Sequence, residues 1–242
     1  MDIPQNLKHK IKRRIFPNDC GADGKLKPHR ISNYFEQAAS IVKAEEFGHL
    51  RVVMLRYNIK VHHEIMSDED ITIETYLSLC TKYFSIRKYL MYNEENILVA
   101  EGLGLWGFMD PQTGSLKQIP KFLTDLCTNA SDEQPEKLKA LEGYSQNLQL
   151  QIRLQDCDPN GHVNNSLYLS YIELGFDESF IKNHTLKEVT LNFKDGMPYG
   201  DTYFLKTEIE NYDDLSIVYQ KFENKNGDLA ALMQSDWLRN SY

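Results

Sequence analysis

Residues 19–38 read DCGADGKLKPHRISNYFEQA, and residues 156–174 read DCDPNGHVNNSLYLSYIEL. Both stretches begin with Asp-Cys, continue through a glycine-containing turn and lead into a segment whose apolar residues recur with helical spacing. Residues 57–75 and 191–209 echo each other in the same way, as YNIKVHHEIMSDEDITIET and LNFKDGMPYGDTYFLKTEI. This repetition predicts that the chain contains two copies of one small fold.

Each copy is expected to contain one helix with a single buried face. The apolar stripe of the first helix covers residues 31–42, and that of the second covers residues 168–176. Small residues interrupt both stripes, Ala38 and Ala39 in the first and Gly175 in the second. Because a small residue in a buried face lets a neighbouring strand approach closely, we expect each helix to lie against a sheet.

Four segments with strand character follow each helix, and alternation of apolar and polar residues is clearest in ITIETYL at residues 71–77. We therefore predict an α+β fold in which each antiparallel sheet wraps around one central helix and the two units can pair edge to edge. The expected strands cover residues 50–63, 71–80, 84–92 and 97–109 in the first copy and 189–194, 202–209, 216–223 and 229–238 in the second.

The segment TNASDEQPEKLKALEGY between the copies is polar, contains Pro135 and lacks apolar periodicity. We expect a linker there, at residues 128–142. The N-terminal unit then covers residues 1–127, and the C-terminal unit covers residues 143–242.

Composition narrows the class of protein. The 242 residues include 27 Lys+Arg and 35 Asp+Glu, for a formal net charge of −8, which argues against a partner as anionic as nucleic acid. No run approaches the roughly 18 apolar residues of a membrane span, and charges occupy the place of a signal peptide's apolar region. We expect a cytoplasmic protein without a membrane partner; the oligomeric state is left open, a homodimer included. The cysteines lack zinc-site or dithiol spacing and are expected to be reduced thiols: Cys20, Cys80, Cys127 and Cys157.

The densest polar cluster of the chain is QDCDPNGHVNNSLY, residues 155–168. Its turn formers end a strand expected at residues 148–154, and Asn164 or Asn165 can cap the following helix. A turn and a cap alone would explain most of these residues, but they do not explain His162. An imidazole, a carboxylate, an amide and the N–H groups of a helix start are groups that can add water to a carbonyl.

Hydrolysis of a thioester suits such a small site. It needs an activated water and a place for the developing oxyanion, whereas the leaving thiolate, with a pKa of about 8.5, needs little help from an acid. The motif D-C-D-P-N-G-H-V-N-N resembles the signature of acyl-acyl-carrier-protein thioesterases, a family with a double hotdog fold. The resemblance extends to KRRIFPNDCGADGKLKPHRISNYFEQAAS, RYNIKVHHEIMSDEDITIETYLS and LWGFMDPQTGSLKQIP in the first half, and so covers nearly the whole chain.

This resemblance implies that the protein releases free fatty acid from acyl-acyl carrier protein in fatty acid biosynthesis. It places the family's catalytic Asp, Asn and His on Asp158, Asn160 and His162. Asn160 and His162 would then hold the attacking water or the thioester carbonyl. No cofactor and no metal are expected.

The sequence departs from the family at one position. Members commonly carry a further acidic residue after the strand next to the motif helix, where VTLNFKDGMPYGD has Gly196 and Met197. Asp195 is adjacent and would reach the site if the strand end is bulged; a solvated carboxylate at a strand end is the equal alternative. Glu173 lies about 16 Å from His162 along a helix at 1.5 Å per residue, which is too far for contact.

Cys157 lies inside the motif and offers a nucleophilic alternative with His162 as its base. If strand alternation continues through the motif, Asp156 and Asp158 share one face and Cys157 points to the other. We therefore expect Asp158 to be the principal carboxylate, with water as the nucleophile.

Three other histidines need an interpretation. His29 is expected to hold in the first copy the position that His162 holds in the second. His62 and His63 are adjacent on an expected strand and so should point to opposite faces, which excludes a shared metal ion.

Acyl carrier protein is acidic, and the basic stretch KHKIKRR at residues 8–14, with Lys117 and Lys121, could attract it. An ordinary charged strand is the equal alternative. Two rival functions also stay open. One is an acyl-coenzyme A thioesterase; the other is a non-catalytic acyl-binding protein, which the missing acidic residue would favour.

Overall fold

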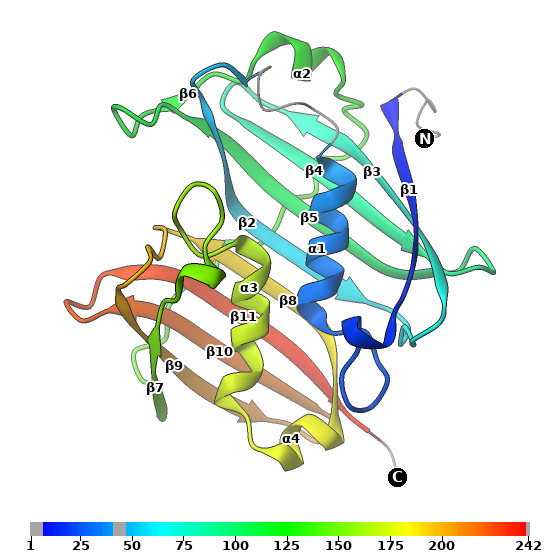
Figure 1. The fold of residues 1–242 in the computed structure, drawn as a ribbon, viewed down its shortest axis with the longest axis vertical. Helices are drawn as coiled ribbons and strands as arrows, with labels where there is room; N and C mark the ends of the chain where they lie inside the picture. Colours follow the sequence, from blue (N-terminus) through cyan, green and yellow to red (C-terminus); the bar gives the residue numbers. More distant parts are fainter. Residues whose placement is uncertain (1–6, 41–46, 241–242) are drawn as a thin grey trace. The chain divides into compact units, whose positions relative to one another are not determined.

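The computed structural model describes residues 7–40 and 47–240 and divides the chain into two compact units, residues 1–135 and 136–242 (Figure 1). Each unit contains an antiparallel sheet with a helix against one of its faces, which confirms the predicted α+β fold. The segment between Cys127 and Ser145 contains no helix or strand. The linker boundaries at residues 128 and 142 stay a prediction.

Unit 1 contains a five-stranded sheet in the order β1-β3-β4-β5-β2, and the short β6 pairs with β5. The residues that alternate in the sequence also alternate in burial along β3, with Ile71, Ile73 and Leu77 buried. The elements are β1 (His9–Arg14), η2 (Pro17–Asp19), α1 (Pro28–Ala39), β2 (Arg51–Val61), β3 (Asp70–Cys80), β4 (Phe84–Tyr92), β5 (Leu98–Met109), β6 (Leu116–Lys117) and α2 (Lys121–Asp125).

Helix α1 packs on this sheet through Phe35. The Phe35 ring is fully buried and stacks on Tyr89 of β4, with ring centroids 5.1 Å apart. On β5, a Cβ at Gly102 would lie 3.0 Å from the Phe35 ring, so the glycine gives the helix room to approach. The helix begins at Pro28, three residues before the predicted stripe, because proline is favoured in a first helical turn. Residues 41 and 42 of the predicted helix lie outside the described residues.

Unit 2 contains a five-stranded sheet in the order β8-β11-β10-β9-β7. Two boundaries differ most from the prediction: β8 begins at His184 instead of residue 189, and β7 ends at Gln151 because residues 154–156 form a turn of 3-10 helix. The other strand ends of unit 2 differ by at most two residues. The elements are β7 (Gln146–Gln151), η4 (Leu154–Asp156), α3 (Asn165–Tyr171), η5 (Ile172–Gly175), α4 (Glu178–Asn183), β8 (His184–Phe193), β9 (Thr202–Asn211), β10 (Leu215–Asn224) and β11 (Leu229–Arg239).

In unit 2, α3 continues into η5, which ends at Gly175 in close contact with the sheet. A Cβ at Gly175 would lie 2.7 Å from Thr207 Oγ1 and 3.2 Å from Gln220 Nε2. Gln220 Nε2 donates to the carbonyl of Ile172 (3.0 Å) and to Thr207 Oγ1 (3.1 Å), which ties the end of the helix to β9 and β10. The predicted use of a small residue for close approach is confirmed at Gly175. None of the described helices is long and apolar enough to cross a membrane.

Replacement of Gly175 tests this close approach. Alanine normally favours a helix over glycine by about 1 kcal/mol. Here the added methyl group would meet Thr207, so we expect Gly175→Ala to destabilise the protein by about 1–3 kcal/mol in urea unfolding. Gly143→Ala is the matched control, because a Cβ at Gly143 would meet no atom within 4 Å. A stabilised Gly175→Ala variant would contradict the interpretation.

Candidate active site

A buried carboxylate anchors the start of the motif loop. Asp156, at the end of η4, accepts hydrogen bonds from Arg153 N (3.1 Å), Nε (3.1 Å) and Nη2 (3.0 Å), and a further one from the Tyr171 hydroxyl. Burial alone would raise the pKa of Asp156, but the bonds from Arg153 outweigh it and hold that pKa below its usual value. Burial, together with the Asp156 charge, raises the pKa of Tyr171 to about 12. A buried carboxylate that lost these hydrogen bonds would be strongly destabilised, so the bonds fix the position at which the motif loop begins.

The motif then forms a tight turn, and the residues before the turn pair with those after it. Asp158 N donates to the His162 carbonyl (2.8 Å), and Gly161 N donates to the Asp158 carbonyl (2.9 Å). Gly161 has a φ of 81°, a left-handed conformation that glycine adopts without strain. Cys157 and Val163 face each other as an isolated bridge. The turn formers therefore act as the sequence predicts.

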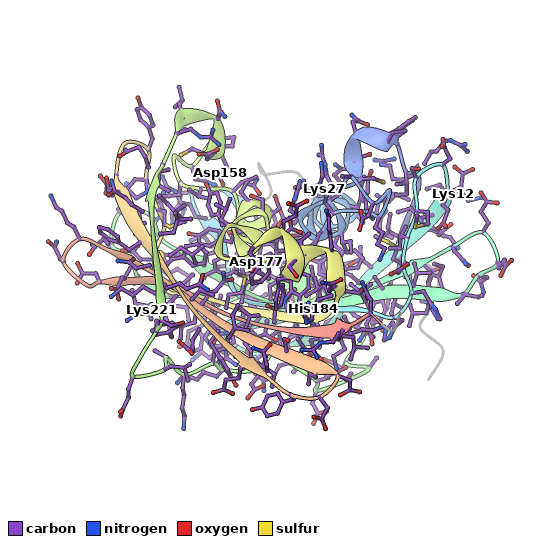
Figure 2. The ribbon with its side chains drawn as sticks, turned by 90° about the horizontal axis from the view of Figure 1, so that it is seen from below. Lys12, Lys27, Asp158, Asp177, His184 and Lys221 are labelled. Carbon is purple, nitrogen blue, oxygen red and sulfur yellow. The ribbon has the colours of Figure 1, made fainter. Side chains whose placement is uncertain are left out.

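The Asp158 carboxylate is used within the turn to hold Asn160. Its Oδ1 accepts the backbone N–H of Asn160 (2.8 Å), and its Oδ2 accepts the Asn160 side-chain amide (3.0 Å). Asp158 is half-buried on the loop that leads into α3, where Figure 2 labels it, and Asn160 is exposed. An amide nitrogen carries two hydrogens, so one is left for another acceptor. Asp158 thus orients Asn160 rather than His162.

His162 is half-buried, and its ring lies against the end of β8. The backbone of His162 pairs with Pro198, and Val163 N donates to the Met197 carbonyl (2.9 Å). The ring comes so near Gly196 that a Cβ there would lie 2.6 Å from His162 Cδ2. Within residues 7–40 and 47–240, no side chain or backbone group hydrogen-bonds to the ring nitrogens. They are therefore available to a water or a substrate.

At the start of α3, two of the N–H groups that the sequence suggested are already bonded to Asn164. Asn164 is the N-cap, and its Oδ1 accepts from Ser166 N (3.0 Å) and from Ser166 Oγ (2.7 Å). Leu167 N donates to the Asn164 carbonyl (2.9 Å). Because the cap uses these donors, the Asn160 amide is the better candidate for contact with an oxyanion.

Asp195 and Glu173 are the two other acidic candidates. The N–H groups of Lys194 and Asp195 both donate to the Ala230 carbonyl, at 2.8 and 3.1 Å, which bends the end of β8. The Asp195 carboxylate is exposed and accepts the N–H of Gly196 (2.8 Å). No contact between Asp195 and His162 is present in the structure. Glu173 lies in η5, beyond the far end of α3 from the motif.

The alternation argument for Cys157 is wrong, because residues 154–156 are helical and not part of a strand. The Cys157 thiol instead donates to the Arg153 carbonyl (3.6 Å). Burial, and then the charges of Asp156 and Asp158, raise the pKa of Cys157. A raised pKa leaves less thiolate at neutral pH, so Cys157 is a poor nucleophile for a different reason than the one predicted.

The predicted equivalence of His29 and His162 is also wrong. Lys25 pairs with Met66 as His162 pairs with Pro198, and the carbonyl of Lys25 accepts from Gly21 N (2.8 Å) as that of His162 accepts from Asp158 N. Lys25 therefore holds the position of His162 in unit 1. His29 lies in the first turn of α1, where burial and then the charges of neighbouring Arg30 and Lys27 lower its pKa to about 4.

The structure also bears on metals and cavities. Nowhere in the described part of the chain do three or more His, Cys, Asp or Glu side chains form a group that could hold a metal ion. His62 Nε2 contacts Glu101 (3.1 Å), and all four cysteines are free.

A cavity of about 640 Å³ lies in unit 2 away from the motif, with a lining of Ser145, Gln146, Leu174, Gly175, Phe176, Asp177, Phe180, Ile209 and Asn211. Its only ionisable lining residue is Asp177, whose carboxylate caps α4 by accepting the N–H of Phe180 (2.7 Å), so we take the motif loop as the candidate site.

Comparison with protein families decides between the functions that this geometry allows. Residues 7–127 match the acyl-ACP thioesterase N-terminal domain, and residues 139–239 match the acyl-ACP thioesterase C-terminal domain. The chain belongs to the acyl-ACP thioesterase family. As a member, it is a thioester hydrolase that acts on acyl chains carried by acyl carrier protein (ACP). No curated protein matches the sequence.

Solved structures with the same fold include other thioesterases. The 12:0-ACP thioesterase from Umbellularia californica has a TM-score of 0.88 at 16% identity, over 97% of this chain and 95% of that one. An acyl-ACP thioesterase from Bacteroides thetaiotaomicron has a TM-score of 0.84 at 15% identity, over 96% and 98%. An acyl-CoA thioesterase II from Mycobacterium marinum has a TM-score of 0.63 at 10% identity, over 97% and 94%. The double hotdog fold predicted for this acyl-ACP thioesterase is confirmed.

The sequence reasoning missed the anchoring role of Asp156 and Tyr171. A signal for it was present in the repeat, because unit 1 contains the same pair at the same separation. Tyr34 Oη donates to Asp19 Oδ2 (2.8 Å), and Asp19 ends η2 as Asp156 ends η4. An Asp and a Tyr kept in both copies, while most of the residues between them differ, indicate a contact that the fold requires.

Removal of the anchoring charge should lower stability in a pH-dependent way. The folded pKa of Asp156 is below its usual value, so its contribution is complete above about pH 4 and is lost as the pH falls through the folded pKa. We expect Asp156→Asn to cost about 1–3 kcal/mol at pH 7, with a difference from wild type that shrinks below about pH 4. Urea unfolding at pH 7 and at several values below pH 4 measures this difference in stability. Asp132→Asn is the control, because Asp132 is exposed. Equal stability of Asp156→Asn and wild type at pH 7 would contradict the anchor.

Proposed function

We propose that this acyl-ACP thioesterase hydrolyses fatty acyl-ACP through a water molecule that His162 activates, with Asn160 and Asp158 as its partners. The observation that supports this best is the double contact from Asp158 to Asn160, which sets a side-chain amide two residues from an imidazole in one tight turn. A turn needs only one such contact. The second one restricts the amide to one orientation, as a group that meets a substrate requires.

The proposed reaction has two steps. In the first, a ring nitrogen of His162 takes a proton from water as the water oxygen bonds to the thioester carbonyl carbon. The carbonyl oxygen gains negative charge and accepts the second N–H of the Asn160 amide. In the second step, the C–S bond breaks and the proton passes from His162 to the leaving thiolate. The products are a free fatty acid and the thiol of the carrier.

Asp158 supports this reaction through Asn160. Its negative charge holds the amide by a charge-assisted hydrogen bond. Asp195 has no assigned step, because its carboxylate accepts the N–H of Gly196. It would act as an additional acid only if that contact opens.

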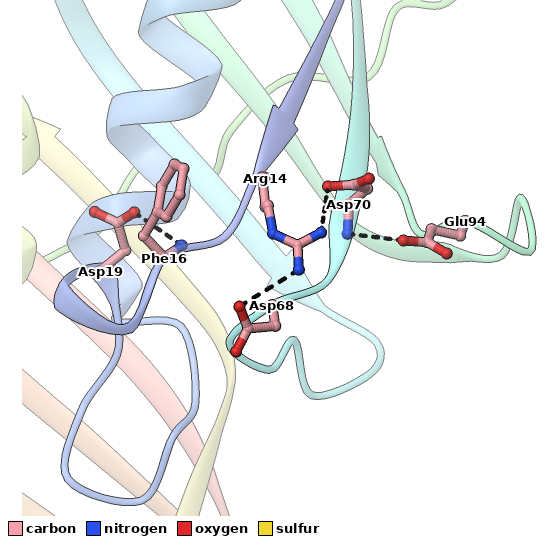
Figure 3. Close-up of polar contacts among 6 residues, drawn as sticks. All are labelled: Arg14, Phe16, Asp19, Asp68, Asp70 and Glu94. Atoms are coloured by element: carbon pink, nitrogen blue, oxygen red, sulfur yellow. Dashed lines mark hydrogen bonds and ion pairs between the residues drawn. The ribbon is translucent and has the colours of Figure 1, made fainter.

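The carrier protein would meet a basic surface, but the stretch at residues 8–14 is largely neutralised. Lys8 and Lys10 both pair with Glu74, at 3.4 and 2.9 Å. Arg14 pairs with Asp68 and Asp70, both at 3.4 Å, and Figure 3 shows this arrangement together with Glu94, which accepts the N–H of Asp70. Lys12 and Arg13 are exposed and have no carboxylate partner among the described residues. We therefore narrow the proposed ACP contact on β1 to Lys12 and Arg13.

A cytoplasmic location is part of the proposal. The four free cysteines are typical of a protein that stays in a reducing compartment. The rival substrate is acyl-coenzyme A, which the same motif could hydrolyse.

Substitutions in the turn test the catalytic residues. We expect His162→Ala and Asn160→Ala each to lower kcat on acyl-ACP by about a hundredfold or more, because a general base or a transition-state hydrogen bond is lost. Cys157→Ala is the control and should change little. Release of free thiol under saturating substrate measures the rates. Wild-type turnover by His162→Ala would refute the site, and an acyl group trapped on Cys157 would replace water attack by covalent catalysis.

Asp158→Asn separates orientation from folding. The new amide keeps an oxygen for one of the two contacts with Asn160 but brings a donor against the other, so the Asn160 side chain should turn away. We expect kcat to fall by about a hundredfold with nearly normal thermal unfolding. An unchanged kcat would remove Asp158 from the mechanism, whereas loss of the folded state would assign it to the turn alone.

The carrier is tested by charge reversal. We expect Lys12→Glu combined with Arg13→Glu to raise KM for acyl-ACP by about tenfold and to change KM for acyl-coenzyme A much less, because the acidic carrier protein contacts the enzyme over an extended surface and coenzyme A is a small molecule. Lys225→Glu, on an exposed turn of unit 2, is the control. Wild-type turnover of acyl-coenzyme A that equals or exceeds that of acyl-ACP would refute the carrier-protein assignment. An equal effect of the double variant on both substrates would refute the docking surface.

A further inference from the structure

Gly196 lies three residues after the end of β8, where its missing side chain leaves room for the ring of His162. A Cβ there would lie 2.6 Å from His162 Cδ2, 2.7 Å from Cγ and 3.1 Å from Nε2. The backbone does not require glycine, because the φ of Gly196 is outside the left-handed region. What the glycine supplies is therefore space and not conformational freedom.

The backbone on both sides of this contact is fixed. Val163 N donates to the Met197 carbonyl (2.9 Å), and His162 pairs with Pro198. The N–H of Gly196 donates to Asp195 Oδ1 (2.8 Å), and its carbonyl accepts from the Tyr203 hydroxyl (3.4 Å). These bonds prevent the two segments from separating to admit a methyl group. A side chain at position 196 would have to displace the ring instead.

Unit 1 shows how the same two positions behave when both carry side chains. Leu26 N donates to the Ile65 carbonyl (2.8 Å), as Val163 N does to Met197, so Glu64 and Lys25 hold the positions of Gly196 and His162. Lys25 Nζ forms an ion pair with Glu64 Oε1. In unit 1, the side chains at these two positions contact each other. In unit 2, the imidazole of His162 occupies the space that a side chain at position 196 would need.

We infer that Gly196 is a positioning residue for His162: the absence of a side chain lets the imidazole rest on the strand end, which holds the ring in its reactive place. The inference rests on the proposed function of His162. It also explains the departure from the family, because a carboxylate at position 196 could not coexist with the ring where it lies. Here the backbone at Gly196, in the loop after β8, does the positioning.

A double-mutant cycle in stability tests the packing without any assumption about activity. We expect Gly196→Ala to lower the thermal unfolding midpoint by about 3 °C or more in the wild-type background. In the His162→Ala background the same change should have little effect, because the ring that it meets is gone. Equal losses in both backgrounds would overturn the inference whatever the enzyme hydrolyses.

The same four proteins test the catalytic consequence. We expect Gly196→Ala to lower kcat on acyl-ACP by about tenfold to a hundredfold with KM within about twofold of wild type, because a displaced base affects the reaction more than binding. It should lower kcat no further in His162→Ala. The His162 ring signals in the NMR spectrum should move in Gly196→Ala and stay in place in the control Gly143→Ala.

The outcomes separate the two claims. A full kcat in Gly196→Ala together with moved ring signals would overturn the positioning role. A full kcat in His162→Ala would overturn the proposed function, while the coupling in unfolding midpoints would still decide whether the glycine seats the ring.

Discussion

Both units depend on a buried carboxylate at the entrance of one loop. Asp156 in unit 2 and Asp19 in unit 1 end a turn of 3-10 helix and accept a hydrogen bond from a helix tyrosine, Tyr171 or Tyr34. A buried charge that is bonded on several sides is costly to move, so the chain enters the helix from the same place in each unit. Every later feature of the loop, including the position of His162, follows from this starting point.

The two loops share a backbone but differ in chemistry. In unit 1, Gly21 N donates to the Lys25 carbonyl, the same bond that links Asp158 to His162 in unit 2. Gly21 cannot orient a neighbouring amide, and Lys25 is committed to an ion pair with Glu64. The duplicated fold therefore supplies one loop geometry twice, while only unit 2 carries the groups that can activate water.

The net charge of the protein does not show how its basic residues are distributed and paired. The basic β1 strand lies beside β3, and carboxylates on β3 and the turn before it neutralise Lys10 and Arg14, two of its four Lys and Arg residues. The surface available to an acidic carrier protein is smaller than the sequence suggests. A few exposed cations can still guide association, because steering depends on local potential and not on net charge.

The sequence by itself determined the repeat, the antiparallel strands, the turn and cap of the motif, and the family. These features follow from the spacing of residues that are close in the sequence. Apolar residues alternate in the strands and recur every three or four residues in the helices, and Asp-x-Asn-Gly is typical of a turn. It also located the candidate residues Asp158, Asn160 and His162 by type and order, although their catalytic roles stay a prediction.

Only the tertiary structure decided which of these groups meet. It turned the carboxylate of Asp158 toward Asn160, occupied the N–H groups at the start of α3 with Asn164, and brought His162 against Gly196. It also corrected the matching of His29 to His162, because bridge pairing rather than residue type assigns equivalent positions. The first two contacts join residues two positions apart, so the sequence supplied both partners and the fold decided only how their side chains are oriented. The third joins residues that local spacing does not relate. His162 and Gly196 are distant in sequence and meet only because the hydrogen bond from Val163 to Met197 aligns two segments of one unit.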